Sequence, residues 1–196
     1  MVTWKILLLV ALLVMVPHLA VAATWKIDPV HTAVEFKIRH LMVSWVKGVF
    51  TNVDGEVDID EADLTKSSVN VRIETASINT NNVKRDDHLR SPDFFDADKY
   101  PVMTFVSKQV VAANGVPVNI VGDLTIRDVT REVTLEVEEY SPVITDLQGK
   151  SRRGATASTE LNRKDYGLTW NKALEAGGVV VGDEVRISLE VELIKE

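Results

Sequence analysis

The sequence predicts an all-β fold, an antiparallel barrel or sandwich of about eight to ten strands, from three observations. Apolar and polar residues alternate with a period of two along most of the chain, which is typical of strands with one buried face. Turn signals such as Asn114-Gly115 and Gly182-Asp183 separate these segments. No linker rich in Pro or Gly divides them, so we expect a single domain.

Composition excludes several classes of protein. With 196 residues the chain is long enough to bury a core, and an apolar fraction of 45% is too high for a disordered chain. The absence of Cys excludes thiolate metal sites, disulfides and Cys nucleophiles. A net charge of −7 argues against nucleic acid as a partner, since such proteins normally present a basic surface.

The N-terminus predicts export. Lys5 precedes an apolar run over 6–16, Pro17 interrupts it, and Ala20-Val21-Ala22 has the small residues of a signal cleavage site. The run is shorter than the roughly 20 residues that span a membrane, and it has no polar face for an amphipathic structural helix. We therefore expect a signal peptide over 1–22, a mature domain over 23–196, and no stable membrane insertion after cleavage.

The strands are expected in order along the mature chain. The clearest alternating segments lie around 34–38, 53–59, 69–73, 133–137 and 185–193, with further strands expected around 102–111, 118–126 and 152–161.

Two segments do not alternate. We expect helical turns over 81–100, lying on the barrel, and a long loop over 162–178. Long ordered loops often close a binding site, although insertions without function are also common.

Metal and catalytic signatures are weak. His31 and His40 flank one strand at an odd spacing, which directs them to opposite faces, and His88 belongs to a distant segment, so no metal site is predicted. The chain has no nucleophile elbow, no phosphate loop and no dinucleotide fingerprint. Asp86 and Asp165 lie among basic residues, where carboxylates usually form ion pairs.

The interior is either filled or hollow. An eight-stranded barrel can be filled by its own side chains or can hold one small ligand, and periodicity does not distinguish the two. The segment 154–159 has small side chains on both faces, which predicts one thin wall.

Five motifs in order resemble the YceI family of secreted lipid-binding proteins, and together they extend over residues 24–194. They are His31 to His40, Gly48-Val49-Phe50, Arg85 to Asp96 with Tyr100-Pro101 and Phe105 after it, Gly122 to Thr130, and Arg163 to Leu168. The resemblance implies an extended lipocalin-like barrel of about eight strands, with short helical segments in its long loops. It also implies a long apolar ligand (a polyisoprenoid, an isoprenoid quinone or a fatty amide) as the only bound cofactor-like molecule, a periplasmic location, and homodimers in some relatives.

Candidate site residues follow from this interpretation. The expected barrel wall is Phe36, Ile38, Phe50, Val71, Ile73, Met103, Phe105, Leu135, Ile187 and Leu189. The expected end closure is Trp45, Leu89, Phe94, Phe95, Leu168 and Trp170. Six polar residues are expected either to line the mouth of the barrel or to form ion pairs that hold its loops. They are His40, Arg85, Asp86, His88, Arg163 and Asp165.

Three functions remain open at this point. The leading hypothesis is a non-catalytic protein that sequesters or carries a lipid, with no catalytic residue. The second is an enzyme that acts on such a lipid through Asp86, His88 or Asp165. The third is a filled barrel that acts through its surface as a stress or interaction protein.

Overall fold

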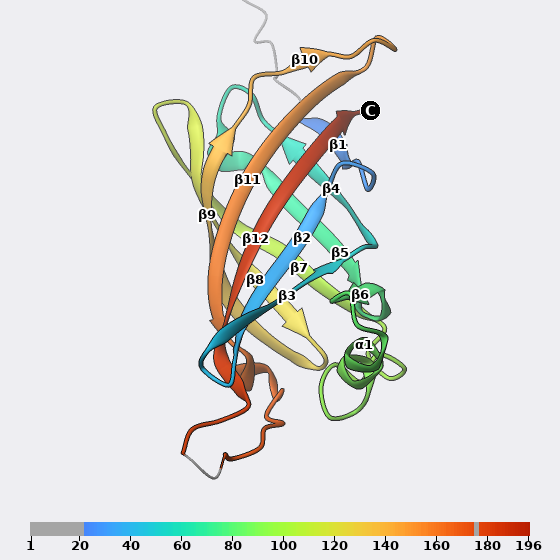
Figure 1. Cartoon of the computed structure of the whole chain (residues 1–196). Helices are drawn as coiled ribbons and strands as arrows, with labels where there is room; N and C mark the ends of the chain where they lie inside the picture. Colours follow the sequence, from blue (N-terminus) through green and yellow to red (C-terminus); the bar gives the residue numbers. More distant parts are fainter. Residues whose placement is uncertain (1–21, 175–176) are drawn as a thin grey trace, which may run out of the picture.

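The chain forms twelve strands with short helical connections in a computed structural model that describes residues 22–174 and 177–196. All of the predicted signal segment except its last residue lies outside the described residues. The strands are β1 (Ala23–Ile27), β2 (Ala33–His40), β3 (Ser44–Phe50), β4 (Val53–Ile59), β5 (Ser68–Glu74), β6 (Ile78–Asn79), β7 (Val102–Ala113), β8 (Val116–Ile126), β9 (Val129–Tyr140), β10 (Ile144–Thr145), β11 (Ser151–Asn162) and β12 (Val181–Lys195) (Figure 1). The helical elements are η1 (Leu64–Lys66), η2 (Thr75–Ser77), α1 (Val83–Arg90) and η3 (Arg163–Tyr166).

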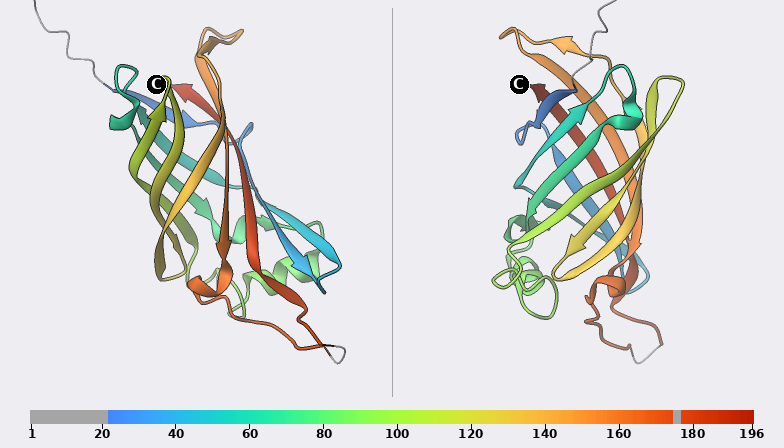
Figure 2. Two further views of the ribbon diagram at one scale, coloured as in Figure 1. Left: turned by 90° about the vertical axis from the view of Figure 1, so that its left-hand side faces the viewer. Right: turned by 180° about the vertical axis from the view of Figure 1, so that it is seen from behind.

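Eight strands close into an antiparallel barrel, which confirms the predicted fold class (Figure 2). Hydrogen bonding runs in the order β11-β9-β8-β7-β5-β4-β1-β12. The ring closes because β12 also pairs with β11, from Asn162 opposite Glu184 to Arg152 opposite Ile194. A closed sheet leaves few free strand edges and encloses an interior.

The sheet forks at β12. On one edge β12 pairs with β2 through Val185–Glu190 and then with β1 through Leu193–Lys195. From β2 the branch continues into β3 and β6. The period-two pattern does not single out β1, which is only five residues long, or β3, whose inward position Gly48 has no side chain.

The non-alternating segments gather at one end of the barrel, here named the α1 end (Figure 1). The helix α1 begins where the Asn82 side chain accepts a hydrogen bond from the Arg85 backbone N–H at 3.1 Å, as an N-cap does. The opposite end, here named the β10 end, holds β10 and the turn between β1 and β2. The predicted helical turns and the long loop therefore lie together at this end. They are distant in sequence, since the residues that cap α1 and η3, Asn82 and Asn162, are 80 positions apart.

Two apolar clusters make up the core. The larger one includes Phe50, Ile78, Met103 and Phe105, and it extends from the barrel to Phe94 of the α1 segment. The smaller one is Trp25, Ile27, Ile59 and Leu193 at the β10 end. Within the described residues, no helix has the length and apolar character needed to cross a membrane.

Candidate functional site

The barrel interior contains two apolar cavities, so the side chains of the described residues do not fill it. The outer cavity, at the α1 end, has a volume of about 330 Å³. The inner cavity, toward the β10 end, has a volume of about 180 Å³. Hollow interiors of this kind are the usual sites for small apolar ligands in barrels.

The two cavities lie next to each other along the barrel. Val34, Ile73, Leu124 and Ile187 line both of them. These four side chains come from β2, β5, β8 and β12, and they form the boundary between the cavities. A chain-like molecule that enters from the α1 end therefore reaches the inner cavity by passing these side chains.

Small side chains on β11 leave room for the inner cavity. Ala155, Ala157 and Thr159 line it, opposite Val191, Leu189 and Ile187 of β12. The lining includes no Asp, Glu, Lys, Arg or His. The predicted thin wall thus lies where the interior is both hollow and free of charge.

Aromatic side chains cover the outer cavity at the α1 end. Phe94 and Trp170 lie with ring centroids 5.2 Å apart, and the His88 ring meets each of them edge-on at 5.0 and 4.9 Å. Phe95 meets Phe50 edge-on at 5.7 Å. This cluster joins α1 and its following turns to the loop after η3, so the two long segments together form the cover.

Arg163 holds that loop in place. Its side chain is only 4% exposed, and its Nε donates to the Gly182 carbonyl at 2.8 Å. Its Nη1 donates to the carbonyls of Leu168 and, at 3.0 Å, Trp170. Burial lowers the pKa of Arg163 from its usual value, yet an arginine remains protonated in proteins. The buried guanidinium thus satisfies backbone carbonyls that would otherwise lack partners.

A second buried network attaches α1 to the barrel. Asp86, which is buried, accepts hydrogen bonds at Oδ1 from Thr80 N at 2.9 Å and Thr80 Oγ1 at 2.5 Å. Arg85 donates to Thr80 Oγ1 at 2.7 Å and to the Thr80 carbonyl at 2.8 Å. These contacts give Asp86 a positioning role in the fold.

The structure brings nearly all of the predicted wall and closure residues to the cavities. Phe36, Ile38, Phe50 and Met103 line the outer cavity, Val71, Phe105, Leu135 and Leu189 line the inner one, and Ile73 and Ile187 line both. Of the predicted closure residues, Leu89, Phe94, Phe95, Leu168 and Trp170 line the outer cavity. Their role in binding stays a prediction.

Trp45 is the exception among the apolar candidates. Its ring does not line either cavity, and the Arg39 guanidinium lies 4.2 Å from the ring centroid. The reason is strand parity, because successive side chains of β3 point to opposite faces and it is Val46 that lines the outer cavity. The expectation that Trp45 closes the barrel is corrected accordingly.

The predicted mouth residues divide into two groups. His40, Arg85, His88 and Arg163 line the outer cavity, whereas Asp86 and Asp165 do not. Asp165 lines an open polar groove of about 900 Å³ between β9 and β11. On β11, only Ala155–Ser158 pair with β9. The three side chains considered for acid–base catalysis are therefore not gathered around one pocket.

Sequence reasoning missed several lining residues. Those that line the outer cavity are Val34, Arg39, Val46, Leu124, Ile126, Leu161, Val180, Val181 and Val185. The alternation of β8 signals Leu124 and Ile126, but Val180 precedes a strand and carries no periodic signal.

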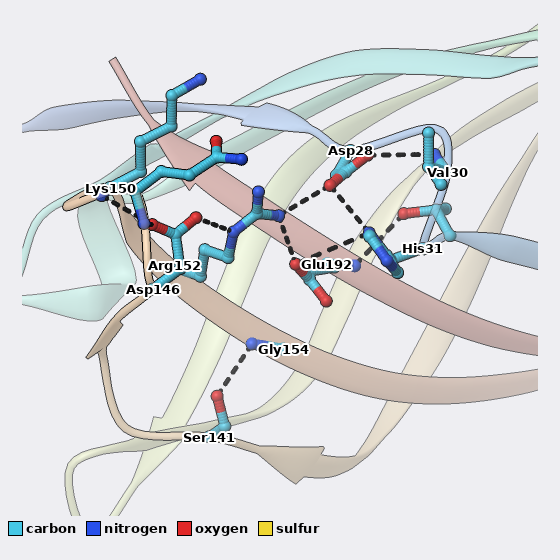
Figure 3. Close-up of polar contacts among 11 residues, drawn as sticks. Asp28, Val30, His31, Ser141, Asp146, Lys150, Arg152, Gly154 and Glu192 are labelled. Atoms are coloured by element: carbon cyan, nitrogen blue, oxygen red, sulfur yellow. Dashed lines mark hydrogen bonds and ion pairs between the residues drawn. The ribbon is translucent and has the colours of Figure 1, made fainter.

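One carboxylate cluster lies at the β10 end, away from this site (Figure 3). Asp28, His31 and Glu192 place ligand atoms within 4.8 Å of one another, the only such group found among the described residues. Arg152 already lies between the two carboxylates, donating to Asp28 at 2.7 Å and to Glu192 at 2.5 Å. The guanidinium neutralises the charge that would attract a metal ion.

Fold and site together define a class of protein, a closed β-barrel with an apolar interior cavity under an aromatic cover. The family model described as YceI-like domain matches residues 25–193. A UPF0312 protein of Staphylococcus epidermidis is 40% identical over 168 residues, which are 86% of this chain and 95% of that protein. The chain belongs to the YceI family, as its motifs predicted.

Solved structures agree with this fold. The YCEI protein of Campylobacter jejuni is 31% identical with a TM-score of 0.68, covering 81% of this chain and 90% of that one. Burkholderia cenocepacia BcnA has a TM-score of 0.71 at 24% identity, covering 85% and 98%. A domain from Saccharophagus degradans, described as a polyisoprenoid binding domain, has a TM-score of 0.66 at 15% identity, covering 89% and 99%.

Proposed function

We propose that this protein sequesters or carries a lipid with a long apolar chain, such as a polyisoprenoid, inside its barrel and without catalysis. The observation that carries the proposal is the pair of adjacent cavities, the inner of which has no charged side chain in its lining. The description of the Saccharophagus degradans domain supports the ligand class, although that domain is related to this chain by fold alone.

The hydrophobic effect supplies the affinity. Each 100 Å² of apolar surface removed from water contributes about 2.5 kcal/mol, so an isoprenoid tail binds without polar contacts along its length. A narrow, flexible chain would pass the four residues that line both cavities more easily than a bulky ring system would. Binding depth is then set by the inner cavity.

The mouth favours a head group that accepts hydrogen bonds. The outer cavity is lined by Arg39, His40, Arg85, His88 and Arg163, and by no carboxylate. Arg163 directs its donors to backbone carbonyls and to Asp183, whereas Arg39 and His40 take part in no ion pair found among the described residues and could meet a phosphate or a quinone carbonyl. The tail would occupy the interior and the head group would remain at the mouth.

Native mass spectrometry of the protein purified from its own host tests this proposal. We expect bound mass that organic extraction releases as an apolar molecule, and a rise in melting temperature on adding an isoprenoid quinone or an isoprenoid phosphate. Squalene, which has the tail but no head group, separates the two contributions. An empty barrel that none of the three ligands stabilises would contradict the proposal.

Ala157→Phe tests the role of the inner cavity. Because Ala157 lines that cavity, a phenyl ring there should reduce the affinity for long-chain lipids by at least about tenfold while short-chain lipids still bind. Ala113→Phe, at an exposed position of the β7–β8 hairpin, is the matched control. Equal losses in both variants would assign the effect to general destabilisation.

The export part of the proposal is supported by the sequence of residues 5–22. We propose a periplasmic protein that begins at Ala23 after cleavage. N-terminal sequencing of the protein recovered from the periplasmic fraction should read Ala-Thr-Trp-Lys, and an intact Met1 in the cytoplasmic fraction would overturn this.

The enzymatic alternative has its own test. His88 lies in the outer cavity and hydrogen-bonds Asp93 at 2.9 Å, so it is the one candidate acid or base that a bound lipid could reach. Incubation with an isoprenoid phosphate or quinone should return the lipid chemically intact. Conversion that is lost in His88→Ala would favour an enzyme.

A further inference from the structure

The hairpin between β2 and β3 has an apolar tip that the cavity does not use. Leu41, Met42 and Val43 form this tip and are 38%, 57% and 77% exposed. Hairpin turns in soluble proteins are normally polar, and three consecutive exposed apolar residues are retained only where they serve a purpose. We name these three residues the hairpin tip.

The backbone conformation of the hairpin tip disfavours large apolar side chains. Leu41 and Met42 have φ values of 51° and 59°, and the Val43 N–H donates to the His40 carbonyl at 3.1 Å. This is the pattern of a type I′ turn, which favours Asn and Gly because both central residues are left-handed. Large apolar side chains at both positions are therefore kept against the local preference of the backbone.

The strands next to the hairpin tip carry unpaired positive charge. No Asp or Glu occurs between Phe36 and Val53, although the whole chain has a net charge of −7. Lys37, Arg39 and Lys47 take part in none of the ion pairs found among the described residues. Lys37 and Lys47 also line the open groove, whose lining includes Glu35, Glu132, Glu136, Glu138 and Glu160. The stretch from Lys37 to Lys47 itself carries three basic and no acidic side chains, and this local excess of positive charge favours an anionic partner at the hairpin.

Trp45 adds an amphipathic ring to this surface. The Arg39 guanidinium lies 4.2 Å from its centroid, Arg186 lies 5.2 Å away and the Lys37 ammonium lies 5.5 Å away. Tryptophan beside basic side chains is characteristic of the membrane–water interface, where the ring lies among head groups and the cations meet lipid phosphates.

The hairpin tip also adjoins the mouth of the outer cavity. The Leu41 N–H donates to the Val180 carbonyl at 2.8 Å, and Arg39, His40 and Val180 line that cavity. The β2–β3 hairpin and the loop after η3 lie together at the α1 end (Figure 2). A surface bound by the hairpin tip would therefore lie next to the entrance.

We propose that the hairpin tip and its basic strands dock the protein on an anionic phospholipid bilayer, with the mouth of the barrel at the membrane surface. The tip inserts among the acyl chains, Trp45 lies at the level of the head groups, and Lys37, Arg39 and Lys47 face the phosphates. This inference goes beyond lipid binding inside the barrel and does not depend on it.

Vesicle co-sedimentation of the purified protein tests the inference directly. We expect partitioning onto vesicles of phosphatidylcholine mixed with phosphatidylglycerol to exceed that onto phosphatidylcholine alone by about tenfold, and to fall with added salt. Lys37→Glu/Lys47→Glu should remove the preference for the anionic vesicles.

The decisive variant is Leu41→Asn/Met42→Gly, which gives the turn its preferred residues. Its melting temperature should equal or exceed that of the wild type, so a loss of vesicle binding of about tenfold would not reflect unfolding. Leu147→Asp is the matched control, since Leu147 is fully exposed near the β10 end and should not affect vesicle binding.

Three outcomes would overturn the inference. They are equal partitioning of the wild type onto both kinds of vesicle, unchanged binding by Leu41→Asn/Met42→Gly, and a dimer in solution that this variant dissociates while vesicles bind neither protein. If vesicles bind but no lipid is ever found inside the barrel, the proposed function fails and the docking surface remains.

Discussion

Arginines that are buried or partly buried hold both ends of the barrel, but their hydrogen-bond partners differ. At the β10 end, Arg152 pairs with Asp28, Asp146 and Glu192, and Arg153 pairs with Glu61. At the α1 end, Arg163 donates three of its four hydrogen bonds to backbone carbonyls and the fourth to Asp183. Carboxylates are the main partners at the first end, whereas backbone carbonyls are the main partners at the second, where, among the described residues, Arg163 meets only one carboxylate, Asp183 at 3.4 Å.

This difference separates an end held by ion pairs from an end that contains the mouth of the outer cavity. At the β10 end, Asp28, Asp146 and Glu192 surround the Arg152 guanidinium (Figure 3). The neighbouring Arg153 pairs with Glu61, and its guanidinium lies 5.7 Å from the centroid of the buried Trp25 ring. At the α1 end, Arg163 positions a loop through hydrogen bonds to backbone carbonyls and one contact to the Asp183 carboxylate.

The largest expected effect on stability comes from removing a large aromatic side chain at the β10 end. Trp25 is 1% exposed, so Trp25→Ala should lower the free energy of unfolding by about 3–5 kcal/mol. Phe95→Ala, at a partly buried position beside an open cavity, should cost less than half as much. Urea denaturation measures both, and equal losses would remove the distinction between a packed end and an open one.

Arg163→Met should have the next largest effect. It leaves the carbonyls of Gly182, Leu168 and Trp170 without their donor, at a cost of about 2–3 kcal/mol in the free energy of unfolding. Because the same loop covers the outer cavity, added lipid should also raise the melting temperature less than in wild type. A variant as stable as wild type would show that these carbonyls find other partners.

The smallest expected effect is on acid stability at the β10 end. Hydrogen bonds from His31 and then Arg152 lower the pKa of Asp28 from 3.8 to about 2, and Arg152 lowers that of Asp146 to about 2. Carboxylates with lowered folded-state pKa values stabilise the fold above pH 4, and this contribution disappears as the pH falls toward 2. The wild type should therefore lose melting temperature over that window.

Asp28→Asn/Asp146→Asn should lose less melting temperature between pH 4 and pH 2 than the wild type does, by a few degrees. Thermal denaturation at both pH values provides the comparison. His31 adds a small opposite dependence, because its raised pKa stabilises the folded state below the ordinary value of 6.5 and this is lost as the pH rises. An identical acid loss in both proteins would show that this cluster is not linked to folding.

Several features could be predicted from residues alone. The alternation of Val185, Ile187 and Leu189 predicted one apolar face of β12, and all three line the cavities. The small residues of 154–159 predicted the thin wall at Ala155 and Ala157. Such features are local, because a strand places every second side chain on the same face wherever it lies.

Tertiary structure alone decided the rest. Whether the apolar faces meet or leave space depends on the closure of β11 onto β12, a pairing between segments distant in sequence. Trp45 lies outside the barrel because the register of β3 against β2 places Gly48, not a larger side chain, opposite Phe36. Strand periodicity is written in the sequence, but register, closure and cavity volume arise from long-range packing, which no local pattern encodes.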